Sequence, residues 1–83
     1  NCNIYKEYEF IYNENNNVYH GIIDLMLEYE DYIDIIDYKL KNIDDKEYVK
    51  QLKGYKKYIE GITEKKINTY LYSVIDGELK EVK

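Results

Sequence analysis

The chain has 83 residues, a net charge of −5 and a single cysteine, so it fits one small domain with no internal disulfide and no cysteine-rich zinc site. No apolar run approaches the roughly 18 residues of a membrane span, and no secretory signal is visible, so we expect a cytoplasmic protein with no membrane contact. The acidic balance argues against a general electrostatic binder of nucleic acid, but a nuclease whose metal-binding carboxylates add local negative charge stays possible.

Three strands are predicted in the first half of the chain. Residues 4–12 alternate between apolar and polar side chains, and the asparagine-rich stretch 13–17 predicts a turn. Residues 18–28 and 33–39 predict the next two strands, with Gly21 marking a bulge or a close approach just before Asp24. These three strands are expected to pair antiparallel in chain order.

The second and third strands place two carboxylates and an ammonium together. If the chain reverses between Glu30 and Asp31, Asp24 lies opposite Asp37, and Asp37 and Lys39 share one face because side chains alternate along a strand. Carboxylates opposed in this way repel each other, and a divalent cation would remove that penalty. Oxygen ligands suit Mg²⁺ or Mn²⁺, and Lys39 would then orient an attacking water or neutralise charge on a phosphate.

A simpler interpretation competes with the metal site. Hairpins often carry acids on their solvent face, and Glu28 and Asp34 are expected to do only that. By pattern alone, a solvated acidic hairpin and a metal-dependent phosphodiesterase site explain Asp24, Asp37 and Lys39 about equally well.

A helix is predicted after Lys39. Asp44 with Glu47 three residues on is typical of a capping box, and Gly61 predicts the C-terminal stop. Spacings of three and four residues predict one buried face and, nearly opposite, a lysine stripe that faces solvent. The predicted buried face comprises Tyr48, Leu52, Tyr55, Ile59 and Ile62, and the stripe comprises Lys46, Lys50, Lys53 and Lys57.

Two further strands complete the expected fold. Residues 66–75 and 78–82 predict strands, and Asp76-Gly77 between them is typical of a type I′ hairpin turn. Because a helix connects the third and fourth strands, these two should be parallel, with a right-handed crossover. The sequence therefore predicts an α+β fold with a mixed sheet of about five strands in the order β-β-β-α-β-β and a helix on one face.

Three motifs in this order resemble the PD-(D/E)xK nuclease superfamily. They are Gly21-Ile22-Ile23-Asp24, Asp37-Tyr38-Lys39 and Gln51-Leu52-Lys53-Gly54-Tyr55. The chain looks most like the nuclease domain at the C-terminal end of AddA and RecB type helicase-nucleases. The resemblance implies a restriction-endonuclease-like core, here lacking the upstream helix of that family. It also implies that residues 1–83 form a single nuclease-like domain and a C-terminal part of a larger protein.

The resemblance assigns roles to individual residues. Asp24 and Asp37 would be metal ligands, with the backbone carbonyl of Tyr38 as a further ligand, and Lys39 would position or activate the attacking water. Gln51 and Tyr55, which lie one helical turn apart at the edge of the predicted buried face, would contact DNA and support the site. Glu7 resembles an acid on the first strand of these domains.

The expected function follows from these assignments. The resemblance implies a Mg²⁺- or Mn²⁺-dependent deoxyribonuclease, expected to act as an exonuclease in DNA repair and recombination. The implied partners are DNA, helicase domains in the same parent chain and a second helicase-nuclease subunit. One alternative is a non-catalytic member of the same fold that binds nucleic acid or protein. Another is a structural domain with an acidic hairpin.

Overall fold

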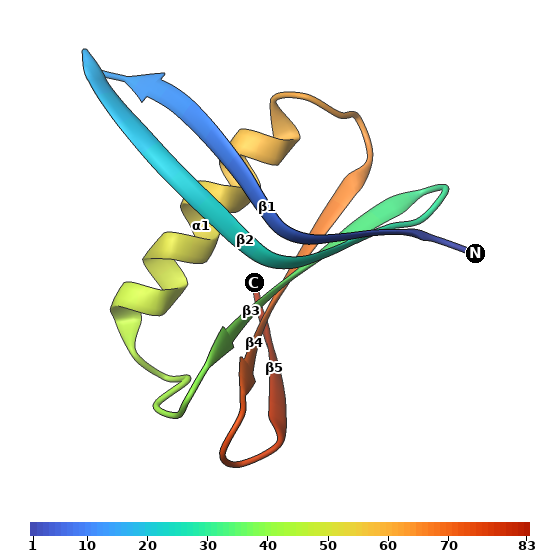
Figure 1. The fold of residues 1–83 in the computed structure, drawn as a ribbon, viewed down its shortest axis with the longest axis vertical. Helices are drawn as coiled ribbons and strands as arrows, with labels where there is room; N and C mark the ends of the chain where they lie inside the picture. The colour runs from blue at the N-terminus through green and yellow to red at the C-terminus, as the bar shows by residue number, and fades with distance from the viewer.

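The computed structural model describes all 83 residues, Asn1–Lys83, and contains five strands and one helix. The elements are β1 (Asn3–Glu14), β2 (Asn17–Glu28), β3 (Tyr32–Lys39), α1 (Lys46–Glu60), β4 (Lys66–Ser73) and β5 (Glu78–Val82). The strands form one sheet in chain order, in which β3 and β4 are parallel and all other neighbours are antiparallel. The small α+β fold, the mixed sheet and the element order agree with the prediction (Figure 1).

The β1–β2 hairpin closes through two asparagines. Asn15 and Asn16 both have positive φ angles, 51° and 66°, as a type I′ turn requires. Asparagine tolerates this left-handed conformation better than most residues. The reversal lies inside the predicted stretch 13–17 but is shorter, so both strands extend further than expected.

The hairpin bends sharply where Glu7 and Asp24 face each other. Lys6 pairs with Leu25 and Tyr8 pairs with Ile23, but the ladder is interrupted between these pairs, and Glu7 has a φ of 51°. Beyond this kink, the outer halves of β1 and β2 turn away from the rest of the sheet and cross over α1 (Figure 1). As a result, β2 parts from β3 close to Asp24.

The register between β2 and β3 confirms the predicted reversal at Glu30 and Asp31. The paired residues run from Glu28 with Ile33 to Leu25 with Ile36. The ladder stops there, one residue before Asp24 and Asp37 would pair. The expectation that these two aspartates face each other as a strand pair is therefore wrong, because β2 has already turned away.

The hydrophobic core lies between the sheet and α1. Odd-numbered residues of β3 and β4 face the helix, which covers them with Leu52, Tyr55 and Ile59. The predicted lysine stripe is exposed, as expected. Ile62 was expected on the buried face, but it lies beyond the helix end and is exposed. The buried apolar residues are Phe10, Ile23, Met26, Ile33, Ile35, Ile43, Leu52, Tyr55, Ile59, Ile67, Leu71 and Val82.

The helix begins one residue later than the capping-box pattern predicted. Asp45, not Asp44, is the N-cap, and its Oδ1 accepts a hydrogen bond of 2.9 Å from the Glu47 amide. Asp44 instead pairs with Lys80 of β5. Gly61 is the C-cap as expected, although its φ of −74° is right-handed, so this end does not need the conformational freedom of glycine.

The turn between β4 and β5 corrects a second local prediction. Ser73 pairs with Glu78, so the loop has four residues, Val74 to Gly77, and within it only Gly77 has a positive φ, of 65°. It is therefore not a two-residue type I′ turn. The loop is longer than predicted because the amides of Val74 and Ile75 donate to the carbonyls of Lys39 and Leu40 at the end of β3, and not to β5.

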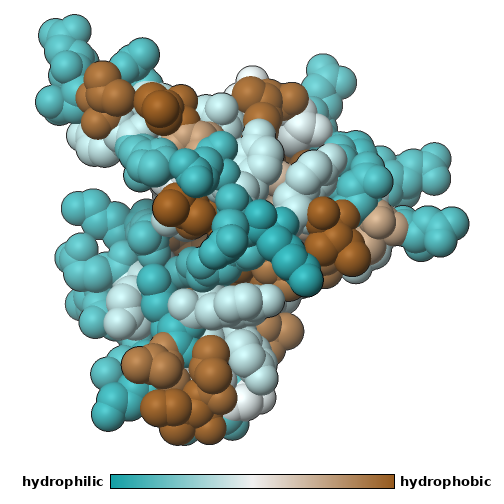
Figure 2. Space-filling model, viewed as in Figure 1, coloured by the Kyte–Doolittle hydropathy of each residue, from teal (hydrophilic) through white to brown (hydrophobic).

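The sheet face opposite α1 is not covered by another element. Leu25, Ile36 and Tyr70 form one row across this face, each only half-buried, and Tyr38 beside Tyr72 continues the next row. Figure 2 shows a further apolar patch at the end of the molecule where β4 turns into β5. The exposed apolar residues at this end are Leu40, Val74, Ile75 and Leu79. The helix α1 is neither long nor apolar enough to cross a membrane.

Candidate functional site

The candidate site lies where β2 and β3 part, at the end of their ladder of paired residues. Asp24 comes directly beyond the last pair, Leu25 with Ile36, and is half-buried. Its Oδ2 accepts a hydrogen bond of 2.8 Å from the Tyr38 amide, one step beyond the last strand pair. A side-chain carboxylate thus replaces the backbone ladder at this point and ties β2 to the end of β3.

Asp37 is the buried acid of the site, with only 3% of its surface exposed. Its Oδ2 lies 2.9 Å from Lys39 Nζ, an ion pair by distance, but the angle is outside hydrogen-bond geometry, so this buried oxygen has no hydrogen bond. Burial and the adjacent Asp24 carboxyl raise the pKa of Asp37 to about 6, against the opposing effect of Lys39. The ionised carboxylate is therefore incompletely compensated by the protein.

Lys39 is held by groups from β3 and α1 together. Its side chain is only 20% exposed. Nζ donates a hydrogen bond of 3.0 Å to Gln51 Oε1 and lies 4.5 Å from the centre of the Tyr48 ring, in cation–π geometry. The structure thus brings Gln51 to the acidic pair, as the sequence predicted, and adds Tyr48. The sequence carried a signal for Tyr48, because a residue three positions before Gln51 lies on the same side of a helix.

Tyr55 lies beneath the site instead of on its surface. It is 9% exposed, and its ring packs edge-on against Phe10 with centroids 5.5 Å apart. Burial, followed by the charge of Asp37, raises the pKa of the Tyr55 hydroxyl. Of its two expected roles, this burial favours support of the site over direct contact with DNA.

Glu7 is close to Asp24 on the side away from α1. By register it lies across from Asp24 at the kink, and both line a hollow of about 330 Å³ together with Lys6 and Tyr38. Its left-handed φ is unfavourable for glutamate and is imposed by the bend of the hairpin. Glu7, which the family resemblance had suggested, therefore lies near Asp24 but does not complete a three-residue metal cluster with Asp24 and Asp37.

The candidate ligands for the predicted divalent cation are two carboxylates. No group of three or more His, Cys, Asp or Glu side chains is arranged to hold a metal, so the candidate ligands are the pair Asp24 and Asp37. Asp37 Oδ2 has no hydrogen bond but lies 2.9 Å from Lys39 Nζ, and Asp24 uses Oδ2 to accept from the Tyr38 amide. Mg²⁺ typically binds one or two carboxylates and completes its octahedron with water and substrate phosphate. The Tyr38 carbonyl as a further ligand stays a prediction.

Comparison with known proteins gives one informative similarity. No protein-family model matches the sequence. The chain is 34% identical over 83 residues to a subunit of the ATP-dependent helicase/nuclease of Clostridium acetobutylicum, and the match covers 90% of this chain. It spans only 7% of the length of that relative. The chain is thus related to a short part of a helicase/nuclease protein.

Proposed function

We propose that this protein hydrolyses phosphodiester bonds in DNA with a divalent cation held by Asp24 and Asp37. The observation that carries the proposal is the convergence of Asp24, Asp37 and Lys39 where β2 and β3 part, with the buried Oδ2 of Asp37 lacking a hydrogen bond. The similarity to a helicase/nuclease protein supports the same chemistry. The proposed domain is a nuclease of the PD-(D/E)xK type with a restriction-endonuclease-like core.

Each side chain of the site has its own role in the proposed reaction. Asp24 and Asp37 would hold the cation, which when bound would supply Lewis acidity at the phosphate and make a water molecule more acidic. The Lys39 ammonium stabilises the negative charge that develops on the phosphate during attack. Gln51 keeps Lys39 in place through its 3.0 Å hydrogen bond, and the Tyr48 ring, 4.5 Å from the same ammonium, restricts it further. Buried Tyr55 supports this arrangement from below.

The biological setting we propose is DNA repair and recombination. The related protein is named a helicase as well as a nuclease, so helicase domains in the same parent chain would deliver DNA to the site, together with a second subunit. DNA would be held through its backbone, which carries affinity without sequence information. The negative overall charge of this domain, −5, is consistent with DNA being gripped mainly by the helicase part.

A cleavage assay with matched variants tests the proposal. Linear single- and double-stranded DNA would be incubated with the protein in Mg²⁺, in Mn²⁺ and in EDTA. Asp37→Ala and Lys39→Met should each lower the cleavage rate by at least about 100-fold, the typical effect of removing a group that stabilises transition-state charge. Asp34→Asn is the matched control, because Asp34 lies on β3 but on the opposite face, bonded to Asn68.

The controls separate a nuclease from the alternatives. Equal cleavage by Asp37→Ala and the unmodified protein would reject the catalytic assignment. Titration with paramagnetic Mn²⁺ should broaden the NMR signals of Asp24 and Asp37 before those of Asp34. Unchanged spectra would favour a structural domain with an acidic hairpin, whereas broadening without cleavage would favour a non-catalytic relative.

A further inference from the structure

The outer side of β5 is an unpaired strand edge. The sheet runs in the order β1-β2-β3-β4-β5, so β5 has β4 on one side and no strand on the other. None of its residues, Glu78–Val82, has a left-handed φ angle, so its free backbone N–H and C=O groups form a regular row. The opposite edge, β1, is interrupted by the kink at Glu7, where φ is 51°. β5 is therefore the better edge for adding a strand from another molecule.

An apolar row of side chains ends at this edge. Tyr38 of β3, Tyr72 of β4 and Leu79 of β5 are neighbours across the sheet, on the face that α1 does not cover. Tyr38 and Leu79 are 46% and 56% exposed. The apolar patch where β4 turns into β5 adjoins the row (Figure 2). A strand added beside β5 would cover Leu79 and continue the row.

The order of charges along β5 favours a second copy of the same strand as its partner. Two identical strands that pair antiparallel about a two-fold axis place one residue opposite itself. With Glu78, Lys80 or Glu81 on the axis, like charges would face each other, which destabilises a strand pair. Val82 gains little there, because it is already buried, at 8% exposure. With Leu79 on the axis, Leu79 faces its own copy, and Glu78 of each strand faces Lys80 of the other.

The faces of the strand agree with this register. Glu78 and Lys80 alternate with Leu79, so their side chains lie on the other face of the sheet, away from the apolar row. Lys80 is paired with Asp44 of its own copy, but its side chain is still 43% exposed and can take a second carboxylate. Opposite charges that meet in one register only select that register over the others.

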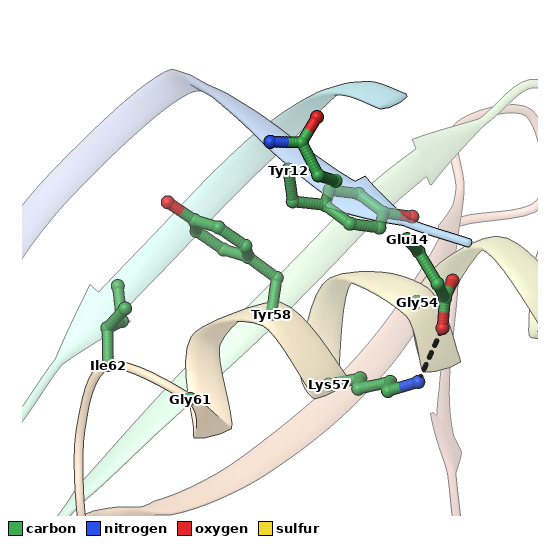
Figure 3. Close-up of a pocket in the computed structure, with 8 residues that line it drawn as sticks. Tyr12, Glu14, Gly54, Lys57, Tyr58, Gly61 and Ile62 are labelled. Atoms are coloured by element: carbon green, nitrogen blue, oxygen red, sulfur yellow. Dashed lines mark hydrogen bonds and ion pairs between the residues drawn. The ribbon is translucent and has the colours of Figure 1, made fainter. Parts of the chain in front are cut away.

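The largest hollow of the molecule carries no comparable argument. It measures about 430 Å³ and lies between the end of β1 and the C-terminal half of α1, with Tyr12 and Tyr58 in its wall (Figure 3). Its lysine, Lys57, is already paired with Glu14 at 2.6 Å. Its lining therefore does not indicate the charge of an occupant, whereas the edge of β5 does.

We infer that two copies of this protein associate edge to edge through β5, antiparallel, with Leu79 on the two-fold axis. The inference does not depend on the proposed nuclease function. Only a short strand is joined, so the interface is small and the dimer transient, with a dissociation constant on the order of 100 µM. The dimer does not involve the acidic site, because Asp37 lies on β3, two strands in from the joined edge.

Sedimentation equilibrium tests the association directly. Protein would be measured from about 10 µM to about 1 mM, in about 0.15 M salt to screen the net charge of the two copies. Leu79→Lys should weaken dimerisation at least about tenfold, because two ammonium groups then meet on the axis. Ile11→Lys is the matched control, since Ile11 is 66% exposed on β1, and it should dimerise like the unmodified protein.

An exchange of charges tests the register. Glu78→Lys and Lys80→Glu should each weaken dimerisation about tenfold when measured alone, because like charges then face each other. An equimolar mixture of the two variants should associate like the unmodified protein, since every cross-strand pair of the mixed dimer again joins opposite charges. Glu60→Lys makes the same charge change at an exposed position of α1 and should dimerise like the unmodified protein.

NMR spectra of the unmodified protein at increasing concentration report which surface is joined, and they decide the question even if a variant does not fold. The amides of β5 should shift, and those of β1 should not. A protein that stays monomeric at about 1 mM would overturn the inference. So would a mixture that associates no better than its components, or equal losses in Leu79→Lys and Ile11→Lys. Shifts confined to Leu25 and Tyr70 would overturn it in favour of face-to-face packing of two sheets.

Discussion

Lys39 Nζ donates a hydrogen bond to Gln51 Oε1 across 3.0 Å, and this contact joins the end of β3 to the first half of α1. The two residues are twelve positions apart, and each comes from an element that also contributes buried residues to the core. The ammonium is therefore fixed relative to Asp37 by the helix as well as by its own strand.

Gln51→Leu should lower the proposed cleavage rate by about tenfold, because Lys39 loses its acceptor and swings away from the phosphate. Gln51 is exposed, so the free energy of unfolding should change by less than about 0.5 kcal/mol. Single-turnover cleavage and urea denaturation measure the two effects. Lys53→Ala, an exposed change on the solvent stripe of the same helix, should alter neither. A variant that cleaves at the unmodified rate would show that Gln51 does not position Lys39.

Asp37 should make the metal-free protein less stable as pH rises from about 4 to about 6. Its pKa is raised from 3.8 to about 6 in the folded state, so the unfolded chain ionises first and the folded state then bears a buried charge that Lys39 compensates only in part. Below pH 4 the group is protonated in both states and contributes nothing. In EDTA at pH 7, Asp37→Asn should therefore be more stable than the unmodified protein by roughly 1–3 kcal/mol.

Denaturation curves at several pH values check this behaviour. The stability difference between Asp37→Asn and the unmodified protein should shrink toward zero as pH falls to about 4. Mg²⁺ should stabilise the unmodified protein more than the variant, since a bound cation compensates the charge. A variant that is less stable than the unmodified protein at pH 7 in EDTA would contradict the assignment of the buried charge.

Gly21 and Gly54 should respond to alanine in opposite directions. A Cβ on Gly21 would lie 2.4 Å from the Phe10 ring, which is buried and stacked on Tyr58, so Gly21→Ala should cost about 1–3 kcal/mol of stability. A Cβ on Gly54 meets only the Tyr12 hydroxyl at 3.7 Å, so Gly54→Ala in the helix interior should stabilise by roughly 0.5–1 kcal/mol. Thermal or chemical denaturation measures both. Similar effects in the two variants would mean that Phe10 can move aside.

Local patterns were sufficient to predict most of the secondary structure. The two-residue period of the strands and the three-four spacing of α1 depend only on which side chains must be buried, and the structure confirms them. The register of β2 and β3 was also predictable, because the reversal after Glu30 fixes it. The errors concern contacts with other elements: Asp44 pairs with Lys80 of β5, and Val74 and Ile75 bond to the end of β3.

The sequence by itself determined the order and type of the short elements, because periodicity is a local property of the chain. Motif order, also local, was enough to select the candidates Asp24, Asp37, Lys39, Gln51 and Tyr55. Only the tertiary structure decided how they meet. The kink at Glu7 turns β2 away from β3 just before Asp24 and Asp37 would pair, and it leaves Asp24 to bind the Tyr38 amide. The packing of α1 on the sheet then brings Gln51 and Tyr48 onto Lys39, a contact that no single element encodes.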